Sequence, residues 1–108
     1  MRKELGKIQR AVFGYGGYQD AMIGISFTLV GEGWGVGDFW GDWSIKRSEG
    51  AKWSEDDRIK LLGAMVMRVN TLLSQAKVTE VNELVGIPVE VTFDNNTLQS
   101  WRVLKEVL

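Results

Sequence analysis

Hydrophobic residues occupy every second position in two stretches of the chain, 22–30 and 87–93. A period of two is typical of a strand that buries one face and exposes the other. Alternation and tight-turn signals elsewhere extend this pattern to five predicted strands. They cover residues 6–13, 19–30, 34–45, 87–93 and 98–104. Residues 31–33 and the pair Asn95-Asn96 tolerate positive φ and are expected to form hairpin turns.

The clearest predicted element is an amphipathic helix that starts after Ser54. Ser54 and Asp57 form a variant of the capping box, and residues 55–57 place negative charge at the helix N-terminus. Apolar residues follow with an unbroken 3-4-3-4-3 spacing, at Ile59, Leu62, Val66, Val69, Leu73 and Ala76. Three more apolar residues widen this stripe: Leu61, Met65 and Leu72. The stripe predicts a helix with a broad buried face.

The predicted elements follow one another as three strands, the long helix, a short helix over residues 79–84, and two strands. Pro88, just beyond the short helix, fits only near the start of a strand or on an edge. This order indicates an α+β fold, an antiparallel β-sheet with one long amphipathic helix packed on one face. Because 108 residues are typical of one domain, we expect a single α+β domain over residues 1–108.

Glycine and aromatic residues are concentrated between residues 13 and 43, which hold nine of the thirteen glycines and eight of the eleven aromatic residues. On the predicted strand 34–45, Trp34 and Trp40 fall on one face and Trp43 falls on the other. A core beneath the helix explains some of these side chains. One helix cannot bury both faces of a strand, so either a second chain covers the other face or aromatic surface is left for a ligand. The apolar stripe of the helix is also wider than one sheet face requires. Together with the two-faced strand, this leads us to expect a homo-oligomer in which helices pair across a symmetry axis.

The chain contains neither cysteine nor histidine. This excludes disulfides, Ser-His-Asp and Cys-His catalysis, and metal sites built on Cys or His. Asp38 and Asp42 share a strand face, but their separation of ~13 Å exceeds the ~5–9.5 Å of paired glycosidase carboxylates. We therefore predict a protein that is not an enzyme and that has no catalytic residues, no metal and no cofactor.

The charge pattern argues against a polyanionic partner. The net charge is −1, and residues 11–45 include four acids but no Lys or Arg. A groove for single-stranded nucleic acid normally interleaves basic and aromatic residues. The longest mostly apolar stretch, 21–30, is about half the ~20 residues that a membrane-spanning helix needs. We expect no membrane partner and, without cysteine or an export signal, a cytoplasmic protein.

The glycine-rich loop 14–18 has two interpretations. It is either a tight turn between strands or a surface of backbone amides, flanked by Tyr15 and Tyr18, that holds a planar or anionic ligand. No Lys-Ser/Thr pair follows the loop, and a strand rather than a helix comes next. The loop therefore matches neither a Walker nor a Rossmann phosphate site.

Three stretches together resemble a family of small uncharacterised proteins of tailed phages and prophages. They are residues 13–24, 33–41 and 84–93, which read FGYGGYQDAMIG, GWGVGDFWG and LVGIPVEVTF. The resemblance runs over most of the chain and implies a phage accessory protein, which would act in the host cell cytoplasm. It brings no assigned catalytic or binding residues. Small phage proteins of this kind commonly serve DNA replication or recombination, virion assembly, or suppression of host defence.

A glycine-lined aromatic surface with distant arginines favours, in this setting, a host-defence antagonist that binds and sequesters a small nucleotide signal. The expected ligand-binding residues are Tyr15, Gly16, Gly17, Tyr18, Gln19, Asp20, Trp34, Arg47 and Arg102. In this hypothesis one of the aromatic residues stacks on a base and the glycine amides meet a phosphate. One of the two arginines neutralises that phosphate, and Gln19 and Asp20 contact polar edges of the base or ribose.

Two other functions stay open. A protein-binding inhibitor would present the tryptophan hairpin to a host defence enzyme. A single-stranded-DNA-binding replication accessory protein would use the aromatic residues as stacking surfaces, although the lack of basic residues in 11–45 disfavours it.

Overall fold

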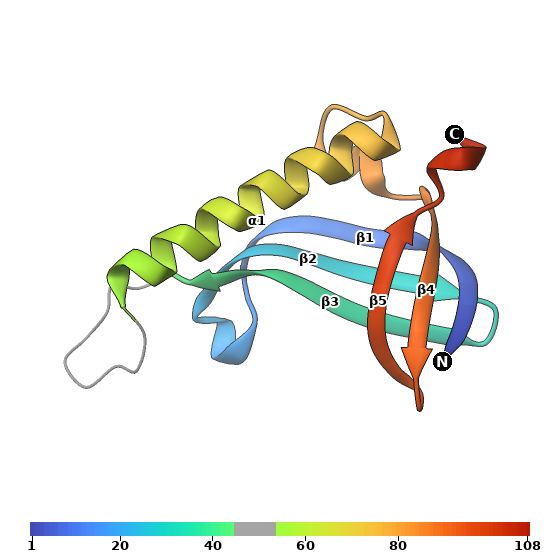
Figure 1. The fold of residues 1–108 in the computed structure, drawn as a ribbon, viewed down its shortest axis with the longest axis horizontal. Coiled ribbons are helices and arrows are strands. Elements are labelled where there is room, and N and C mark those ends of the chain that lie inside the picture. The colour runs from blue at the N-terminus through green and yellow to red at the C-terminus, as the bar shows by residue number, and fades with distance from the viewer. Residues whose placement is uncertain (45–53) are drawn as a thin grey trace.

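The computed structural model describes residues 1–44 and 54–108 of the chain. The strands are β1 (Arg2–Gly16), β2 (Met22–Gly31), β3 (Trp34–Trp43), β4 (Pro88–Asp94) and β5 (Thr97–Val103). Helix α1 (Glu55–Ala76) lies between β3 and β4 in the chain (Figure 1). Three short 3-10 helices are η1 (Tyr18–Asp20), η2 (Val81–Leu84) and η3 (Lys105–Val107). The predicted α+β fold, an antiparallel sheet with one long helix, is confirmed.

The sheet is organised around β1, which pairs with two different strands. The strand order is β3-β2-β1-β4-β5, and all neighbours are antiparallel. Residues 2–7 of β1 pair with β4, and residues 6–16 pair with β2. A register shift lies between Ile8 and Arg10, and such irregularities bend a strand. As a result β4 and β5 cross the other three strands steeply (Figure 1).

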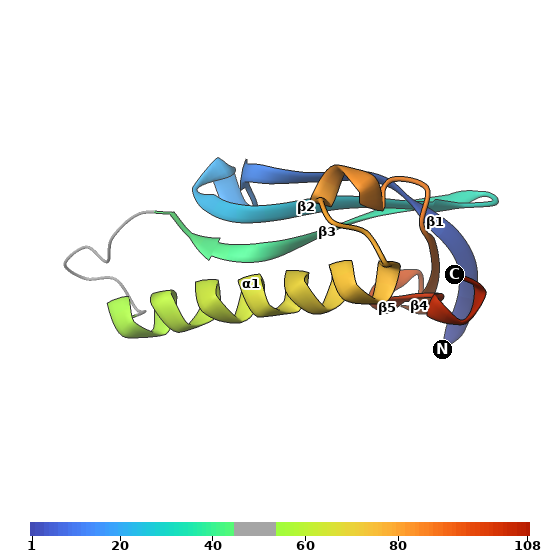
Figure 2. The same ribbon diagram turned by 90° about the horizontal axis from the view of Figure 1, so that it is seen from above.

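Helix α1 lies along β3, one edge of the sheet, and its second half approaches β5 (Figure 2). It begins as predicted, because the Ser54 side chain accepts a hydrogen bond from the Asp57 N–H at 3.0 Å. It ends at Lys77, which adopts the left-handed conformation with φ of 59°. The helix therefore spans the two edge strands and faces the inner side of the bent sheet.

The buried face of α1 differs from the predicted stripe. Met65, Leu72 and Ala76 are buried, whereas Ile59 and Val66 are each 58% exposed. The prediction that both of these residues belong to the core is wrong. Because α1 packs over the edge strand β3 rather than over the middle of the sheet, only the middle of its broad apolar stripe is buried, and residues on both borders of the stripe are exposed.

Several strand boundaries shift relative to the prediction. Strand β1 extends to Gly16, so part of the predicted glycine-rich loop is strand. Strand β2 begins three residues later than predicted, at Met22, because Gln19 and Asp20 have φ of 52° and 55° and belong to η1. The short predicted helix is the 3-10 turn η2. Asn95 and Asn96 have positive φ, which confirms the predicted turn between β4 and β5. Residue 45, where the third predicted strand ends, lies outside the described residues.

Candidate functional site

An aspartate holds the two edges of the sheet together. Asp38, half-buried on β3, accepts hydrogen bonds through Oδ2 from the indole N–H groups of Trp40, at 3.0 Å, and Trp101, at 2.7 Å. Its Oδ1 accepts the Phe39 N–H at 2.9 Å. Trp101 lies on β5, at the opposite edge of the sheet from β3. This carboxylate is therefore a link between the edge strands, and its hydrogen bonds are engaged in holding two indoles.

The two indoles form the centre of an aromatic cluster. Their ring centroids are 5.4 Å apart and their planes differ by 21°, so Trp40 and Trp101 are stacked. Phe27 on β2 meets both rings edge-on, with centroid distances of 4.7 and 5.0 Å. Such pairs stabilise by ~0.5–1.5 kcal/mol each beyond the area they bury. The cluster fixes the relative positions of β2, β3 and β5.

Arg68 of α1 covers the cluster from the helix side. Its guanidinium carbon lies 3.9 Å from the centroid of the Trp40 ring, a cation–π contact. Among the salt bridges of the described residues, none involves Arg68. The Arg68 guanidinium therefore rests on the Trp40 ring, and no described carboxylate occupies its N–H groups.

Two cavities flank the Arg68 side chain. One, of about 230 Å³, lies between α1 and β5 and is lined by Trp40, Arg68, Gln75, Trp101 and Arg102 among others. The other, of about 250 Å³, lies between α1 and β3 and is lined by Phe39, Trp40, Leu61 and Arg68 among others. Trp40 and Arg68 line both cavities, so these two side chains stand at the centre of the groove between α1 and the edge strands.

Arg102, the predicted site residue on β5, lines the first cavity but is engaged by acids. Its guanidinium donates to Glu90 at 3.2 Å and to Glu106 at 3.1 Å. These hydrogen bonds, Glu90 first, raise the pKa of Arg102 above its ordinary value. The pKa of Glu106 is lowered, chiefly by a hydrogen bond from its own backbone and then by Arg102. A ligand phosphate at Arg102 would have to compete with both carboxylates.

The predicted loop residues are together at one end of the sheet, where β1 turns into β2. Tyr15 and Tyr18 are exposed. Gly16 is buried because the Phe39 ring packs against it, and a Cβ there would lie 3.0 Å from that ring. Gly17 has φ of 67°, which favours glycine. The Ala21 N–H donates to the Tyr18 carbonyl at 3.0 Å, so the loop is closed by its own backbone.

Trp34, also predicted to contact the ligand, lies far from that loop. It pairs with Gly31 at one end of β2, whereas Gly16 pairs with Met22 at the other end. Nine residues of extended strand correspond to ~30 Å. The Trp34 ring packs edge-on against Phe93, and its Nε1 is buried with no partner among the described residues. Trp34 and the loop therefore cannot contact one small ligand.

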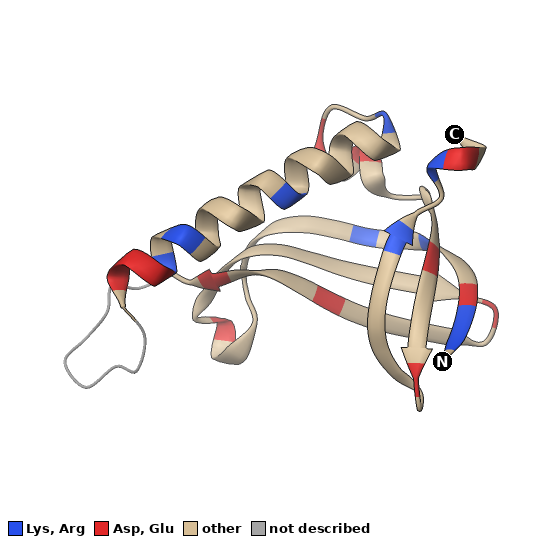
Figure 3. Cartoon of the chain, viewed as in Figure 1, with Lys and Arg blue, Asp and Glu red and all other residues tan. Residues whose placement is uncertain are grey.

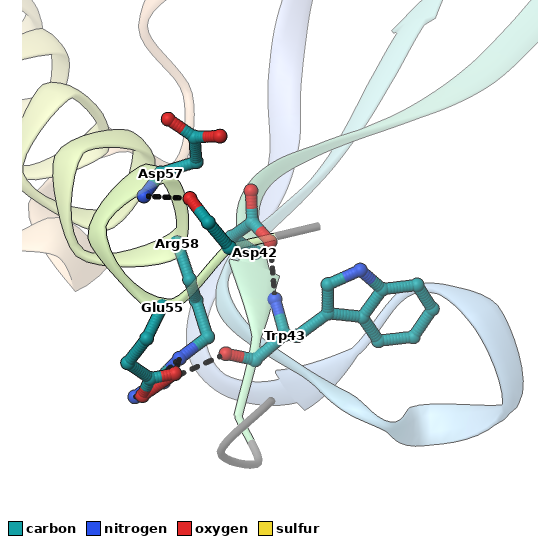
Figure 4. Close-up of polar contacts among 6 residues, drawn as sticks. Asp42, Trp43, Glu55, Asp57 and Arg58 are labelled. Atoms are coloured by element: carbon teal, nitrogen blue, oxygen red, sulfur yellow. Dashed lines mark hydrogen bonds and ion pairs between the residues drawn. The ribbon is translucent and has the colours of Figure 1, made fainter. Parts of the chain in front are cut away.

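Another arginine, Arg58, makes structural contacts at the junction between β3 and α1 (Figure 4). Arg58 pairs with Glu55 and donates to the Trp43 carbonyl at 3.1 Å. The hydrogen bond with Glu55 raises the pKa of Arg58. The Trp43 N–H in turn donates to Asp42 at 2.7 Å. Arg58 is thus structural, and Arg47, the remaining predicted phosphate contact, lies outside the described residues.

The structure brings together a different set from the predicted one. Among the described residues, Arg102 is the one predicted site residue that lines the groove. The sequence did not predict that Trp40 and Trp101 are hydrogen-bonded to Asp38. Part of the signal is in the sequence. Asp38 and Trp40 share a strand face, and Arg68 lies three residues after Met65 and four before Leu72, on the border of the buried helix face.

Comparisons with known proteins add no assignment, since no family model, no curated protein and no solved structure matches this chain. Among residues 1–44 and 54–108, no cluster of three acidic residues is placed to hold a metal ion. Within the same residues no helix is long and apolar enough to cross a membrane.

Proposed function

We propose that this protein binds a small nucleotide without changing it chemically, in the groove between α1 and the edge strands β3 and β5. The observation that carries the proposal is Arg68, stacked on Trp40 at 3.9 Å and paired with no acid among the described residues. A guanidinium held in this way is suited to bidentate recognition of a phosphate. Trp101, which is half-buried and lines the first cavity, supplies aromatic surface for a base, whereas Trp40 is only 8% exposed beneath Arg68.

The size of the groove limits the ligand. Cavities of about 230 and 250 Å³ are smaller than the ~300–1,000 Å³ of typical small-molecule pockets. Each accommodates a ring or a phosphate, and a movement of the Arg68 side chain would join them. The base and phosphate contacts are thus placed in the groove rather than at the glycine loop, Arg102 is kept as a contact, and Tyr15 and residues 17–20 have no role in binding the ligand.

The resemblance to small phage proteins supports a biological setting for this binding. In that setting the protein is a host-defence antagonist that sequesters a nucleotide signal in the host cytoplasm. The proposed binder is a homo-oligomer, because apolar side chains of α1 and β1 remain exposed in one chain.

The test is a thermal-shift screen against mono-, di- and cyclic nucleotides, followed by calorimetric titration of any hit. A ligand at a hundredfold excess over Kd stabilises the folded state by about 2.7 kcal/mol. We expect Arg68→Gln to weaken binding by ~10- to 100-fold, because a charge-assisted hydrogen bond contributes ~1.5–3 kcal/mol. Lys60→Gln, an exposed change on the same helix with the same loss of charge, is the matched control and should bind as the parent protein does.

The outcome of the screen is decisive in both directions. A selective shift that Arg68→Gln abolishes, with the nucleotide recovered intact, supports sequestration in the groove. A flat response to the whole panel would overturn the nucleotide proposal and favour a protein partner. Equal loss in both variants would show that general charge, rather than the Arg68 site, drives binding.

A second candidate, binding of single-stranded nucleic acid, is favoured by the strand arrangement. The strand arrangement resembles a partly open five-stranded barrel of the OB type. The bent strand β1 pairs with both β2 and β4, a helix lies between β3 and β4, and Asp38 and Trp101 join the two edge strands. Such barrels bind oligonucleotides on the face of their second and third strands, and here that face carries Phe39. The likeness is one of fold alone. Acidic and basic segments are interspersed along the ribbon, and this charge distribution argues against binding of single-stranded nucleic acid (Figure 3).

Oligonucleotide binding measured by fluorescence anisotropy at several salt concentrations separates the two candidates. For nucleic-acid binding, log K should fall with log salt with a slope of about −0.7 per neutralised phosphate. Phe39→Ala should then weaken binding by ~1–3 kcal/mol, while Arg68→Gln acts only through its charge. For the proposed nucleotide binder, we expect no oligonucleotide binding at physiological salt.

A further inference from the structure

The second half of β1 leaves one strand edge without a partner. β1 pairs with β4 only as far as Lys7, and Ile8 then exchanges hydrogen bonds with Gly86 and Ile87. Beyond Ile8, the pairing of β1 within the described residues is with β2 alone. The end of this strand, residues 11–16, carries no charge and no proline. Proteins usually protect an exposed strand edge with charged residues or proline, so this edge lacks both of those protections.

Exposed apolar side chains of β1 lie next to this edge, on the inner face of the sheet. Phe13 and Tyr15 are 61% and 75% exposed, although they share that face with the buried Ile25. A Phe or Tyr presents ~150–250 Å², so the pair exposes roughly 200–340 Å². Ile59 and Val66, on the flank of α1 opposite Arg68, are also exposed. A stable interface needs ~800 Å² from each partner, and these side chains with the strand edge provide a substantial part of it.

We propose that this edge is occupied by a second copy of the chain, with the two β1 strands paired antiparallel about a two-fold axis. The inference rests on the oligomeric part of the proposed function and is independent of the ligand. A two-fold contact uses the same patch twice, so the patch must be complementary to itself. Charge meets this requirement, since Arg10 and Asp20 lie toward opposite ends of the edge and neither has an ion pair among the described residues.

Side-chain size also fits a register centred on Gly14. In that register Phe13 lies opposite Tyr15 of the partner subunit. Aromatic cross-strand pairs are favourable. Gly14 stands opposite its own copy, and a Cβ built on it has no atom within 4 Å. The expected assembly joins the two sheets edge to edge.

The first test is the mass of the protein in solution, measured by light scattering over a range of concentrations. We expect a species of twice the chain mass of 12.1 kDa for the parent protein. Phe13→Lys should give a monomer, because a charge on an inward-facing edge position opposes strand pairing. Met67→Lys is the matched control, since Met67 is 62% exposed on α1, and it should remain a dimer. A monomeric parent protein, or a Phe13→Lys dimer, would overturn the proposal.

A second test does not depend on how well Phe13→Lys folds. The chain has no cysteine, so Gly14→Cys introduces the sole thiol. On oxidation, a strand pair centred on residue 14 should give a disulfide-linked dimer in high yield, because directly opposed residues have Cα atoms ~4.5–5.5 Å apart. Gly63→Cys, placed where a Cβ also meets nothing within 4 Å, should not cross-link. Equal cross-linking of both variants would contradict the register. Nucleotide binding is measured separately, so either proposal can fail alone.

Discussion

Asp38→Ala should destabilise the protein by about 3 kcal/mol, which lowers Tm by roughly 12–24 °C for a domain of this size. The reason is that one carboxylate oxygen accepts from both Trp40 and Trp101. Removing it leaves two indole N–H groups in a half-buried site without their acceptor. Each such group costs ~1–3 kcal/mol. Thermal and urea denaturation followed by near-ultraviolet circular dichroism would measure the loss.

Two control variants sharpen this measurement. Glu32→Ala removes an exposed acid from the turn between β2 and β3 and should change stability by less than ~0.5 kcal/mol. Asp38→Asn retains one oxygen that can accept an indole N–H, so we expect an intermediate loss. If Asp38→Ala proved as stable as Glu32→Ala, the link between the sheet edges would contribute nothing to the fold.

The same link has a consequence for the groove. Trp101 on β5 is held over β3 by Asp38, and the cavity beside Arg68 is lined by both tryptophans. Asp38 is therefore a positioning residue for the proposed site. Stability and ligand binding should decline together in Asp38→Ala, whereas Arg68→Gln should affect binding alone. This difference separates the support of the site from the site itself.

Local patterns were sufficient to predict most secondary structure. Alternation predicted β2 and β4 because each buries one face, and Ser54 predicted the start of α1 because a side-chain acceptor at that position satisfies a free helix N–H. Asn95 and Asn96 predicted their turn because asparagine tolerates positive φ. Each of these signals acts over a few residues, which is the range that a single sequence conveys.

The candidate site could not be predicted in the same way, because it depends on how distant elements meet. Trp101 and Asp38 are separated by 63 residues, and nothing local to either indicates the other. The position of α1 over the sheet edge decides that Arg68 covers Trp40 and that Ile59 is exposed. The broad apolar stripe of the helix is compatible with several rotations about its axis, so the sequence alone leaves this choice open.

Gly41→Ala should have an effect as large as Asp38→Ala, a loss of about 3 kcal/mol in the free energy of unfolding. Gly41 on β3 faces Gly24 on β2. A Cβ at Gly41 would lie 2.2 Å from the Ile23 carbonyl oxygen and 2.9 Å from the Gly24 Cα. Both of these neighbours are backbone atoms, which cannot rotate away as a side chain can. The strands would have to separate, and urea denaturation would measure the cost.

Gly37→Ala is the matched control for this close approach. Gly37 lies on the same strand and the same face, four residues away, but a Cβ there comes no nearer than 3.7 Å, to the Phe27 carbonyl oxygen. This is ordinary van der Waals contact. Because alanine also restricts the unfolded chain, Gly37→Ala should be neutral or stabilise by up to ~1 kcal/mol. If the two variants lost the same stability, intrinsic strand preference rather than contact between β2 and β3 would explain the glycines of this hairpin. A large difference would show that the glycines let the two backbones approach closely, which sets the position of β3 and therefore of Trp40.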